Sequence, residues 1–575
     1  MFATTRCLRF QDILPRTTAN FAALTPLQWL DRAATAFPNQ EAVCHRPSDN
    51  NNNNNIVSRS WLETRNRAVS LASTLSNDLG CGRNEVVQVM LRNTPEMVES
   101  HFAVPMTGSV LGCINTRLDA SNVSYILGHS EAKVFLYDSV FSQVVKDAID
   151  MLPTSARRPI LIQVGNDDDD DGENDTSVSS ASSPYAYESL ISGGNSSFAW
   201  CTPKDEFDAI ALNYTSGTTG QPKGCVVHHR GAYLTALGNT LAFGGMGSQN
   251  STRYLWTLPM FHCNGWNFPY TIAALGGTNI CLDTVDVPSI RRGIFEDGAT
   301  HLCGAPIVLG MTIEACASIQ KEEVALDREL KMMVAAAPPP AAVLCRASEV
   351  GINVTHVYGL TEVYGPATVC EWRSEWDSLD DEEKASLLSR QGVPYVTQDE
   401  LTVLDQETGE QVPADSETIG EVVMRGNQVF KGYHKNEEET NKALRNGYFH
   451  TGDLGVICED GYIALKDRAK DIIISGGENI SSIEVENILH KHEHVTAAAV
   501  VAMPHDKWQE VGCAFVETRV DIEDEGAFEL ELIAWCKERM PRFKAPHKVV
   551  VGELPKTITG KVQKFELRKV AQKLQ

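Results

Sequence analysis

Short apolar runs alternate with amphipathic segments along most of the chain. Residues 85–91 and 132–137 are rich in β-branched and aromatic side chains and predict strands, whereas residues 61–79 repeat their apolar positions with a helical period. Strands that alternate with helices form βαβ units, and such units build a mostly parallel sheet. We therefore predict an α/β fold for the large N-terminal part.

The pattern changes near Asp467. Beyond this position, residues 484–492 predict a helix, residues 497–503 a strand and residues 528–539 a second helix. A segment of about a hundred residues is long enough for a small domain. The sequence therefore predicts an α+β C-terminal domain after a boundary close to Asp467.

Two polar stretches interrupt the N-terminal part. Residues 49–55 are nearly all Asn, and residues 166–183 are rich in Asp and Ser. Neither stretch has apolar side chains whose burial would offset the entropy of ordering, so both predict mobile surface insertions. Metal binding by the Asp run 167–171 is the alternative to a solvated tract.

We expect residues 21–466 to form the N-terminal domain and residues 467–575 the C-terminal one.

Length and composition fit a globular protein of several units. The 575 residues exceed what one hydrophobic core usually holds, and 42% hydrophobic with 22% charged residues are ordinary values. No run reaches the roughly 20 apolar residues of a transmembrane helix, so none is predicted. The formal charge of −25 argues against a nucleic-acid partner, because such a protein needs basic surface to displace phosphate counterions.

The cysteines and the termini bear on the compartment. The 15 cysteines are scattered without a C-x-x-C pair, which is typical of a reducing compartment. Residues 1–20 contain three arginines and one acid, Asp12, and fit either a cleaved targeting segment or a disordered terminus. The last residues, 573–575, do not match the Ser-Lys-Leu peroxisomal signal. We expect an intracellular protein, with the cytoplasm favoured over a mitochondrion or another organelle.

The run from Tyr214 to Gly224 carries the strongest chemical signal. It follows the apolar residues 209–212, and we expect a helix to start after it. Its hydroxyl side chains, its glycines and its lysine are suited to wrapping triphosphate oxygens, although the spacing is not that of a Walker A loop. A Ser/Thr/Gly linker is the alternative. The predicted phosphate contacts are Thr215, Ser216, Gly217, Thr218, Thr219, Gly220 and Lys223.

Two carboxylates stand in turn-like motifs. Glu362 follows Thr361 in the run Tyr-Gly-Leu-Thr-Glu, and a carboxylate beside a hydroxyl is suited to holding Mg²⁺ on phosphates. Asp453, in Thr-Gly-Asp-Leu, is suited to accepting hydrogen bonds from both ribose hydroxyls. The alternatives are a surface acid at Glu362 and a turn or helix cap at Asp453. The adjacent His262 and Cys263 are residue types that can bind a metal or supply a nucleophile. No further residues with zinc-ligand spacing accompany them, so an ordinary structural role is favoured.

These motifs resemble, in order along the chain, those of the adenylate-forming superfamily, which contains acyl-CoA synthetases, luciferases and the adenylation domains of peptide synthetases. Residues 214–224 resemble its phosphate-binding loop. The stretches 259–266, 471–486 and 555–564 look most like the plant-type acyl-activating enzymes. The other matching segments are 358–362, 450–454 and 467–471.

The resemblance assigns a role to each nucleotide-binding residue. It implies that Thr361 contacts the α-phosphate and that Glu362 serves the metal. Tyr358 and Gly359 would flank the adenine. Arg468 would be a second ribose contact beside Asp453.

The resemblance also implies the residues of the later steps. Lys470 matches the pivot about which the small, mobile C-terminal domain rotates, and Lys561 matches the lysine that meets the carboxylate and the α-phosphate. His262 resembles the gate between the acyl pocket and the pantetheine tunnel, for which a packing histidine is the alternative. Gly476 and Gly477 resemble the lining of that tunnel.

The activity implied is that of an acid–thiol ligase. A small monocarboxylic acid, either short or medium aliphatic or benzoate- or cinnamate-like, reacts with Mg-ATP to give an acyl-adenylate and pyrophosphate, and coenzyme A then displaces AMP. Two alternatives stay open: an adenylating enzyme with another acceptor, such as a luciferase-like oxygenase, and a non-catalytic binding protein of the same fold. One departure is Ala335, which stands where relatives have glycine and adds a methyl group near the acyl or adenine pocket.

Overall fold

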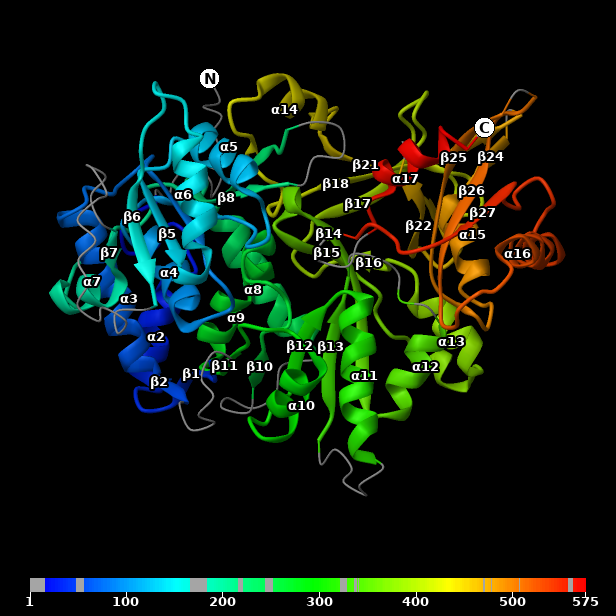
Figure 1. Ribbon diagram of the computed structural model, residues 1–575. Coiled ribbons are helices and arrows are strands. Elements are labelled where there is room, and N and C mark those ends of the chain that lie inside the picture. Colours follow the sequence, from blue (N-terminus) through cyan, green and yellow to red (C-terminus); the bar gives the residue numbers. More distant parts are fainter. Residues whose placement is uncertain are drawn as a thin grey trace, which may run out of the picture.

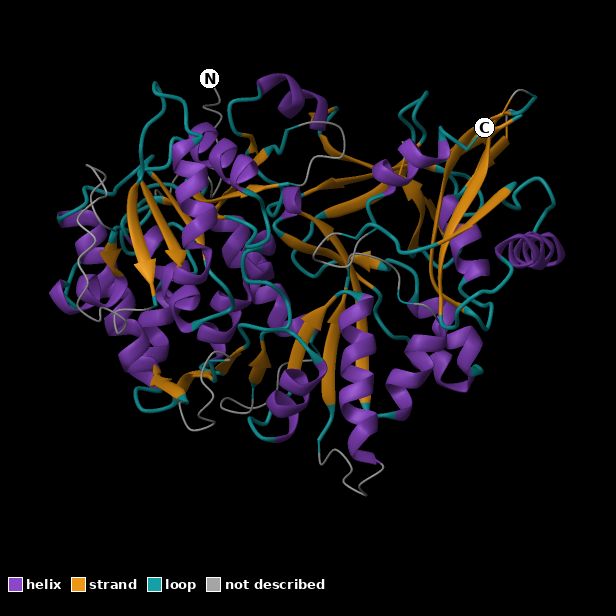
Figure 2. Cartoon of the chain, viewed as in Figure 1, coloured by secondary structure: helices purple, strands orange, loops and turns teal. Residues whose placement is uncertain are grey.

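In the residues that the computed structural model describes, the strands form four sheets with helices packed around them (Figures 1 and 2). The described residues are 16–47, 56–165, 184–215, 221–243, 252–320, 328–335, 339, 341–468, 471–476, 478–505, 507–556 and 562–574. Residues 1–15 and the two predicted insertions, 49–55 and 166–183, lie outside the described part.

The first sheet has eight strands in the order β19-β9-β8-β4-β3-β5-β6-β7. Its strands from β8 to β7 are parallel neighbours, whereas β9 and β19 add antiparallel pairs at one edge. The bounds are β3 (Val86–Met90), β4 (Val110–Cys113), β5 (Val134–Asp138), β6 (Ile160–Val164), β7 (Tyr185–Ala186), β8 (Ala209–Tyr214), β9 (Gly224–His228) and β19 (Gly432–Tyr433).

The second sheet has nine strands in the order β16-β15-β14-β13-β12-β10-β11-β1-β2. Its strands from β1 to β14 are parallel neighbours, and the edge strands β2, β15 and β16 are antiparallel. The bounds are β1 (Glu41–His45), β2 (Val57–Ser60), β10 (Arg253–Leu255), β11 (Thr278–Cys281), β12 (His301–Gly304), β13 (Leu330–Val334), β14 (Ile352–Leu360), β15 (Gly365–Val369) and β16 (Val393–Pro394).

Helices connect the parallel strands, as βαβ units require. Ser60 starts α3 by accepting a hydrogen bond from the backbone N–H of Glu63, which satisfies one of the unpaired donors of the first turn. Nearly every residue of α4 is buried, which explains why its sequence shows no polar face. The helices are α2 (Gln28–Ala36), α3 (Trp61–Asn77), α4 (Pro95–Met106), α5 (Ala120–Ser130), α6 (Ser142–Asp150), α7 (Tyr187–Gly193), α8 (His229–Ala242), α9 (Phe268–Leu275), α10 (Val287–Phe295), α11 (Pro306–Gln320) and α12 (Ala341–Glu349).

The third sheet is antiparallel and was not predicted. It lies between the parallel sheets and the C-terminal elements in Figure 1. Its five strands are β17 (Glu400–Leu404), β18 (Gly420–Arg425), β20 (Leu444–Arg445), β21 (Tyr448–Ile457) and β22 (Ile463–Arg468). Helices α13 (Asp381–Leu388) and α14 (Glu437–Ala443) fall in the same part of the chain.

The fourth sheet, also of five strands, belongs to the C-terminal part and has a hydrophobic core of its own, which includes Ile473, Val500 and Leu532. These elements, coloured orange to red in Figure 1, gather on one side of the molecule. We keep the boundary close to Asp467 as a proposal. The elements are β23 (Ile473–Ser475), β24 (Glu478–Ile480), β25 (Val495–His505), β26 (Gln509–Thr518), β27 (Lys548–Val551), α15 (Ser482–Leu489), α16 (Glu525–Arg539) and α17 (Lys564–Ala571).

The predicted elements can be compared with these bounds. The strands predicted at 85–91 and 132–137 and the helix predicted at 61–79 correspond to β3, β5 and α3 within a few residues. The helix expected directly after the loop at 214–224 is wrong, because strand β9 intervenes before α8. Within the described residues, no helix combines the length and apolar character that crossing a membrane requires.

Candidate functional site

Three predicted nucleotide-binding side chains meet where β14, β21 and β22 lie together. The Tyr358 hydroxyl donates to Asp453 Oδ2 at 2.6 Å, and Arg468 Nε lies 3.2 Å from Asp453 Oδ1. Asp453 and Arg468 are opposite each other in the β21–β22 pairing. Burial and then the charge of Asp453 raise the pKa of Tyr358, so its phenol stays a neutral donor. A neutral donor and a cation therefore hold one carboxylate.

The turn before Asp453 is fixed by local hydrogen bonds. Gly452 has φ +72°, a left-handed conformation that favours glycine. Its N–H donates to Glu421 Oε1 at 3.0 Å, and Glu421 Oε2 lies 2.8 Å from His450 Nδ1. The Thr451 hydroxyl donates to the Val422 carbonyl at 2.7 Å. The Thr-Gly-Asp motif thus encodes a defined turn that precedes the predicted ribose contact.

Gly359 permits a close approach of two backbone segments. A Cβ atom at this position would lie 1.9 Å from the carbonyl oxygen of Gly365, which no side chain can occupy. The β14–β15 pairing shifts register between Tyr358 and Gly359. Tyr358 lies beside this irregularity and contacts Asp453, and β14 leads directly into the short helix η3 (Thr361–Val363), which carries Thr361 and Glu362.

Glu362 is the centre of a second cluster. The Tyr433 hydroxyl donates to Glu362 Oε1 at 2.8 Å, and the Lys223 ammonium lies 4.8 Å from the centre of the Tyr433 ring. Lys223 Nζ also lies 2.5 Å from Glu439 Oε2. Burial and then the charge of Glu362 raise the pKa values of the Tyr433 phenol and the Cys225 thiol, so both remain neutral.

The donor set at Glu362 fits Mg²⁺ in a particular way. Among the described residues Glu362 has no ion-pair partner, and no three His, Cys, Asp or Glu side chains gather in a metal-binding group. Mg²⁺ is commonly held by one or two carboxylates together with substrate phosphates and water. A single carboxylate beside a hydroxyl therefore suits a metal that arrives with a polyphosphate.

The two described ends of the predicted phosphate loop are joined. The backbone N–H of Thr215 donates to the carbonyl oxygen of Lys223 at 3.0 Å, and Tyr214 pairs with Gly224 across the β8–β9 ladder. Both predicted contacts at these ends, Thr215 and Lys223, are thereby fixed to the sheet edge. The other predicted site residues that lie outside the described part are Ser216, Gly217, Thr218, Thr219, Gly220, Lys470, Gly477 and Lys561.

His262 begins an unusual turn, η2 (His262–Asn267). Every residue from Cys263 to Asn267 has a positive φ, between 42° and 65°. Left-handed backbone costs non-glycine residues roughly 1–2 kcal/mol each, so the turn persists only if its surroundings hold it. The side-chain amides of Asn264 and Asn267 supply such contacts, to Cys113 Sγ at 3.0 Å and to the Tyr364 carbonyl at 2.7 Å.

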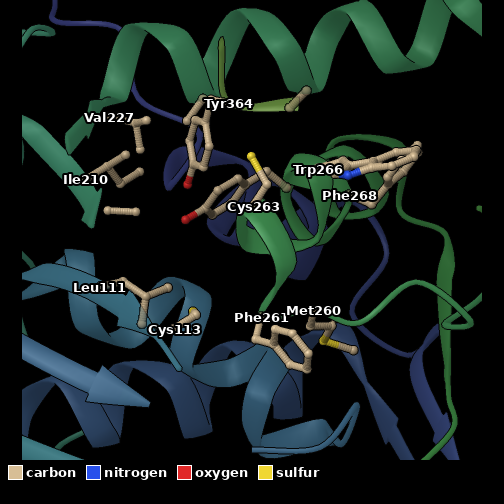
Figure 3. Close-up of a cluster of buried hydrophobic side chains, with 14 of the residues drawn as sticks. Leu111, Cys113, Ile210, Val227, Met260, Phe261, Cys263, Trp266, Phe268 and Tyr364 are labelled. Carbon is tan, nitrogen blue, oxygen red and sulfur yellow. The ribbon is translucent and has the colours of Figure 1, made fainter. Parts of the chain in front are cut away.

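Apolar side chains complete the support of this turn. Figure 3 shows Cys263, Trp266 and Phe268 on the turn and the following helix, with Tyr364 beside Cys263 and with Leu111 and Cys113 opposite. Burial raises the pKa of the Cys263 thiol, with a smaller contribution from Glu362. Cys263 is therefore neutral, and this neither supports a thiolate nucleophile nor favours a metal ligand.

Gly476 and Ala335 occupy tight positions. Gly476 lies in the β23–β24 turn with φ +60°, and a Cβ atom there would come within 2.8 Å of the Trp508 ring. Its N–H donates to the Trp508 carbonyl at 2.8 Å. Ala335 follows β13, is 7% exposed and packs in the main apolar core, so its methyl group takes up buried space.

Tyr433 and Glu439 were not predicted as site residues. Tyr433 donates a hydrogen bond to Glu362 although 71 residues separate them in the chain, and Glu439 pairs with Lys223 across 216 residues. Pairing of β19 with β9 brings them there. The only sequence signal is the acidic run in the first turn of α14, which is equally typical of a helix start.

Known proteins resemble the chain over nearly its full length. Residues 30–434 match the family model of AMP-binding enzymes, and residues 484–561 match that of the AMP-binding enzyme C-terminal domain. The peroxisomal acetate/butyrate–CoA ligase AAE7 of Arabidopsis thaliana is 43% identical over 98% of this chain and 97% of its own. The 2-methylpropanoate–CoA ligase CCL4 of Humulus lupulus is 43% identical with the same coverage.

A solved structure has the same fold. The anthranilate CoA ligase AuaEII, in complex with anthranoyl-AMP, superposes with a TM-score of 0.80 at 22% identity, over 97% of this chain and 99% of the other. The likeness covers the large N-terminal part and the small C-terminal part, as the predicted α/β fold class requires.

Proposed function

The chain belongs to the family of AMP-binding enzymes, and on this premise we propose that it is an AMP-forming acid–CoA ligase acting on a small monocarboxylic acid. The proposal rests on the contacts among Tyr358, Asp453 and Arg468. The tyrosine and the arginine both contact the buried carboxylate of Asp453, which is the side chain predicted to bind the ribose. Glu362, four residues after Tyr358 in the chain, forms a second cluster with Tyr433 and Lys223, which supplies the charges that phosphates and a metal need.

Adenylation would use these groups together. Asp453 and Arg468 orient the ribose, and Tyr358 and Gly359 flank the adenine. Lys223 exchanges Glu439 for phosphate oxygens, while Thr361 donates to the α-phosphate. Mg²⁺ held by Glu362 would neutralise charge on the leaving pyrophosphate. Attack by the substrate carboxylate on the α-phosphorus breaks its bond to the pyrophosphate oxygen and leaves an acyl-adenylate.

Thioester formation would use the C-terminal domain. We propose that this domain turns about Lys470 and that His262 gates the acyl pocket against the tunnel lined by Gly476 and Gly477. The CoA thiol then attacks the acyl carbon and AMP leaves. The mixed anhydride makes AMP a good leaving group, so no residue of the chain needs to become acylated.

The relatives narrow the proposed substrate. Their names specify acetate, butyrate and 2-methylpropanoate, all short aliphatic acids. We therefore place short aliphatic acids ahead of the benzoate- or cinnamate-like acids. An acceptor other than CoA and a non-catalytic protein of this fold are the alternative functions.

The compartment remains a separate proposal. We propose the cytoplasm, and the relatives named peroxisomal make a peroxisome the first competitor. Fractionation of cells that produce the untagged protein distinguishes the two.

The first test measures pyrophosphate release by the purified protein with Mg-ATP and a panel of aliphatic and aromatic acids, with and without CoA. We expect acyl-CoA and AMP only when CoA is present, with the highest rate for a short aliphatic acid. Release of pyrophosphate with an adenylate that CoA does not consume would indicate another acceptor. No release with any acid would favour the non-catalytic alternative.

Glu362→Gln tests the proposed metal contact. The amide keeps the size and can still accept from Tyr433 but lacks the charge that attracts Mg²⁺. We expect the Mg²⁺ concentration for half-maximal adenylation to rise roughly tenfold or more, because affinity depends on the number of charged ligands. Asp297→Asn is a control for a buried carboxylate that pairs with Arg46 instead. An unchanged Mg²⁺ requirement in Glu362→Gln would contradict the assignment.

A further inference from the structure

His129, near the end of α5, joins both ends of the segment that carries Thr215 and Lys223. Its Nδ1 lies 2.8 Å from the Tyr214 hydroxyl, one residue before Thr215. Its ring stacks on Tyr125 with centroids 5.4 Å apart, and the Tyr125 hydroxyl donates to the Pro222 carbonyl at 3.3 Å, one residue before Lys223. His129 therefore contacts Tyr214, which precedes Thr215, and Tyr125, which binds the residue before Lys223.

A second histidine, His434, directly follows β19 and contacts the same cluster. The His129 and His434 rings meet edge to face with centroids 5.3 Å apart. The backbone N–H of His434 donates to the carbonyl of Gly224 at 2.7 Å, directly after Lys223. The Lys435 ammonium donates to the His129 carbonyl at 2.9 Å and pairs with Glu131 at 2.6 Å. The cluster therefore links α5, the β8–β9 hairpin and the segment after β19.

We propose that His129 is a positioning residue for ATP binding, which holds Thr215 and Lys223 at the spacing that the triphosphate requires through Tyr214 and Tyr125. This inference rests on the proposed function of the Thr215–Lys223 segment. His129 itself need not touch the nucleotide, because it acts on the residues that flank both contacts.

The cluster is also sensitive to protonation. Burial lowers the pKa of His129, and His434 and Lys435 lower it further, whereas Glu131 opposes them. Burial and Lys435 lower the pKa of His434. The phenols of Tyr125 and Tyr214 stay neutral, because burial raises their pKa values. Both histidines are thus uncharged at neutral pH.

The sign of the pH effect follows from these directions. Below the ordinary histidine value of 6.5 the unfolded chain binds a proton before the folded one does, so the cluster's stability is fully present above that pH and is lost as pH falls toward the lowered pKa. Protonation also turns Nδ1 into an obligatory donor, which forces the Tyr214 hydroxyl to accept. A surface groove of about 410 Å³, lined in part by Tyr125 and His129, gives solvent protons access.

Substitutions separate the hydrogen bond from the ring packing. His129→Phe keeps the stacked ring and loses Nδ1, Tyr214→Phe loses only the hydroxyl, and His129→Asn keeps a polar atom near the Nδ1 position without a titrating group. We expect both Phe variants to raise the KM for Mg-ATP roughly tenfold, as the loss of one part-buried hydrogen bond implies, with the KM for the acid unchanged. His129→Asn should recover most of the ATP affinity and lose the fall in kcat/KM for ATP below pH 6.5.

The matched control is His547→Asn, which alters another edge-to-face histidine pair, His505 and His547, with centroids 5.4 Å apart. Its ATP kinetics in pyrophosphate exchange should equal those of the wild type. Calorimetric binding of Mg-ATP to the same variants is measured in parallel, so the result does not depend on turnover. Inactive wild type that still binds ATP would contradict the proposed function and leave the binding test intact.

Two results would overturn the proposal. One is unchanged ATP affinity in both Phe variants, and the other is an equal change in the KM for ATP and for the acid, which a general loss of structure would produce. If His129→Phe does not fold, Tyr214→Phe tests the same hydrogen bond alone.

Discussion

Lys561→Ala is expected to slow formation of the acyl-adenylate by about a hundredfold to a thousandfold, the usual effect of removing one preorganised donor from a developing charge. Lys561 lies outside the described residues, and its role rests on the match of its Thr-Gly-Lys motif to the family. A cation near the α-phosphate acts mainly on the transition state, in which charge builds on five-coordinate phosphorus. Single-turnover pyrophosphate release measures this step.

The second half-reaction provides the internal control. When chemically prepared acyl-adenylate and CoA are supplied, Lys561→Ala should release AMP at the wild-type rate, because the phosphoryl step has been bypassed. Lys569→Ala controls for loss of a lysine in the same tail. Its side chain is 62% exposed and pairs with Glu566 at 2.9 Å, a contact that contributes little at the surface. Adenylation at the wild-type rate in Lys561→Ala would remove that residue from the mechanism.

The parts of the site that sequence reasoning found are those encoded within short segments. Asp453 and Arg468 lie opposite each other in one hairpin, so two motifs close in sequence place the two predicted ribose contacts side by side. The family resemblance is confirmed by matches covering residues 30–434 and 484–561. The alternation of strands and helices predicted one mostly parallel sheet, whereas the N-terminal part has two sheets with parallel strands at their centres.

The parts that sequence reasoning missed depend on distant pairing. Tyr433 reaches Glu362 only because β19 adds to the edge of β9, and a two-residue strand has no pattern that could announce it. The antiparallel third sheet was missed for a related reason, since the burial along β21 does not alternate regularly. The strand Gly224–His228 was not predicted, because the glycine-rich loop before it suggested a helix start. The two β-branched valines of this segment are the signal for a strand.

The turn after His262 could not be predicted either. Gly265 and the asparagines suggest single left-handed positions, but five consecutive ones, including Trp266 at φ 50°, need the contacts of Cys113 and the surrounding apolar side chains. Local propensity gives no sign of a conformation that tertiary contacts impose. The same contacts place a neutral Cys263 beside Glu362, where the sequence alone left open a reactive thiol.

Asp453→Asn should reduce kcat/KM for ATP roughly a hundredfold, since charge-assisted hydrogen bonds are lost on one buried group. The carboxylate accepts from the Tyr358 hydroxyl at 2.6 Å and pairs with Arg468 at 3.2 Å, with only 8% of its side chain exposed. An amide in its place directs N–H groups at a donor or a cation. Steady-state kinetics with varied ATP at saturating acid measure the effect.

Asp460→Asn is the matched control for removing a partly buried, arginine-paired carboxylate. Asp460 accepts from Arg390 at 2.9 and 3.0 Å in the same part of the chain. We expect this variant to unfold at lower temperature, with unchanged ATP kinetics. A similar loss of kcat/KM in both variants would show that the effect of Asp453→Asn comes from damaged packing rather than from the nucleotide.

Deoxy-ATP substrates identify the atoms that Asp453 would bind. The wild type should discriminate against 2′-deoxy-ATP and 3′-deoxy-ATP by roughly tenfold or more, because each lacks one donor to the carboxylate. In Asp453→Asn the penalty for the missing hydroxyl should shrink, since the partner that it served has already changed. This coupling is the signature of direct contact. If the variant and the wild type discriminate equally between ATP and both deoxy analogues, Asp453 stabilises the Tyr358–Arg468 cluster without binding the ribose.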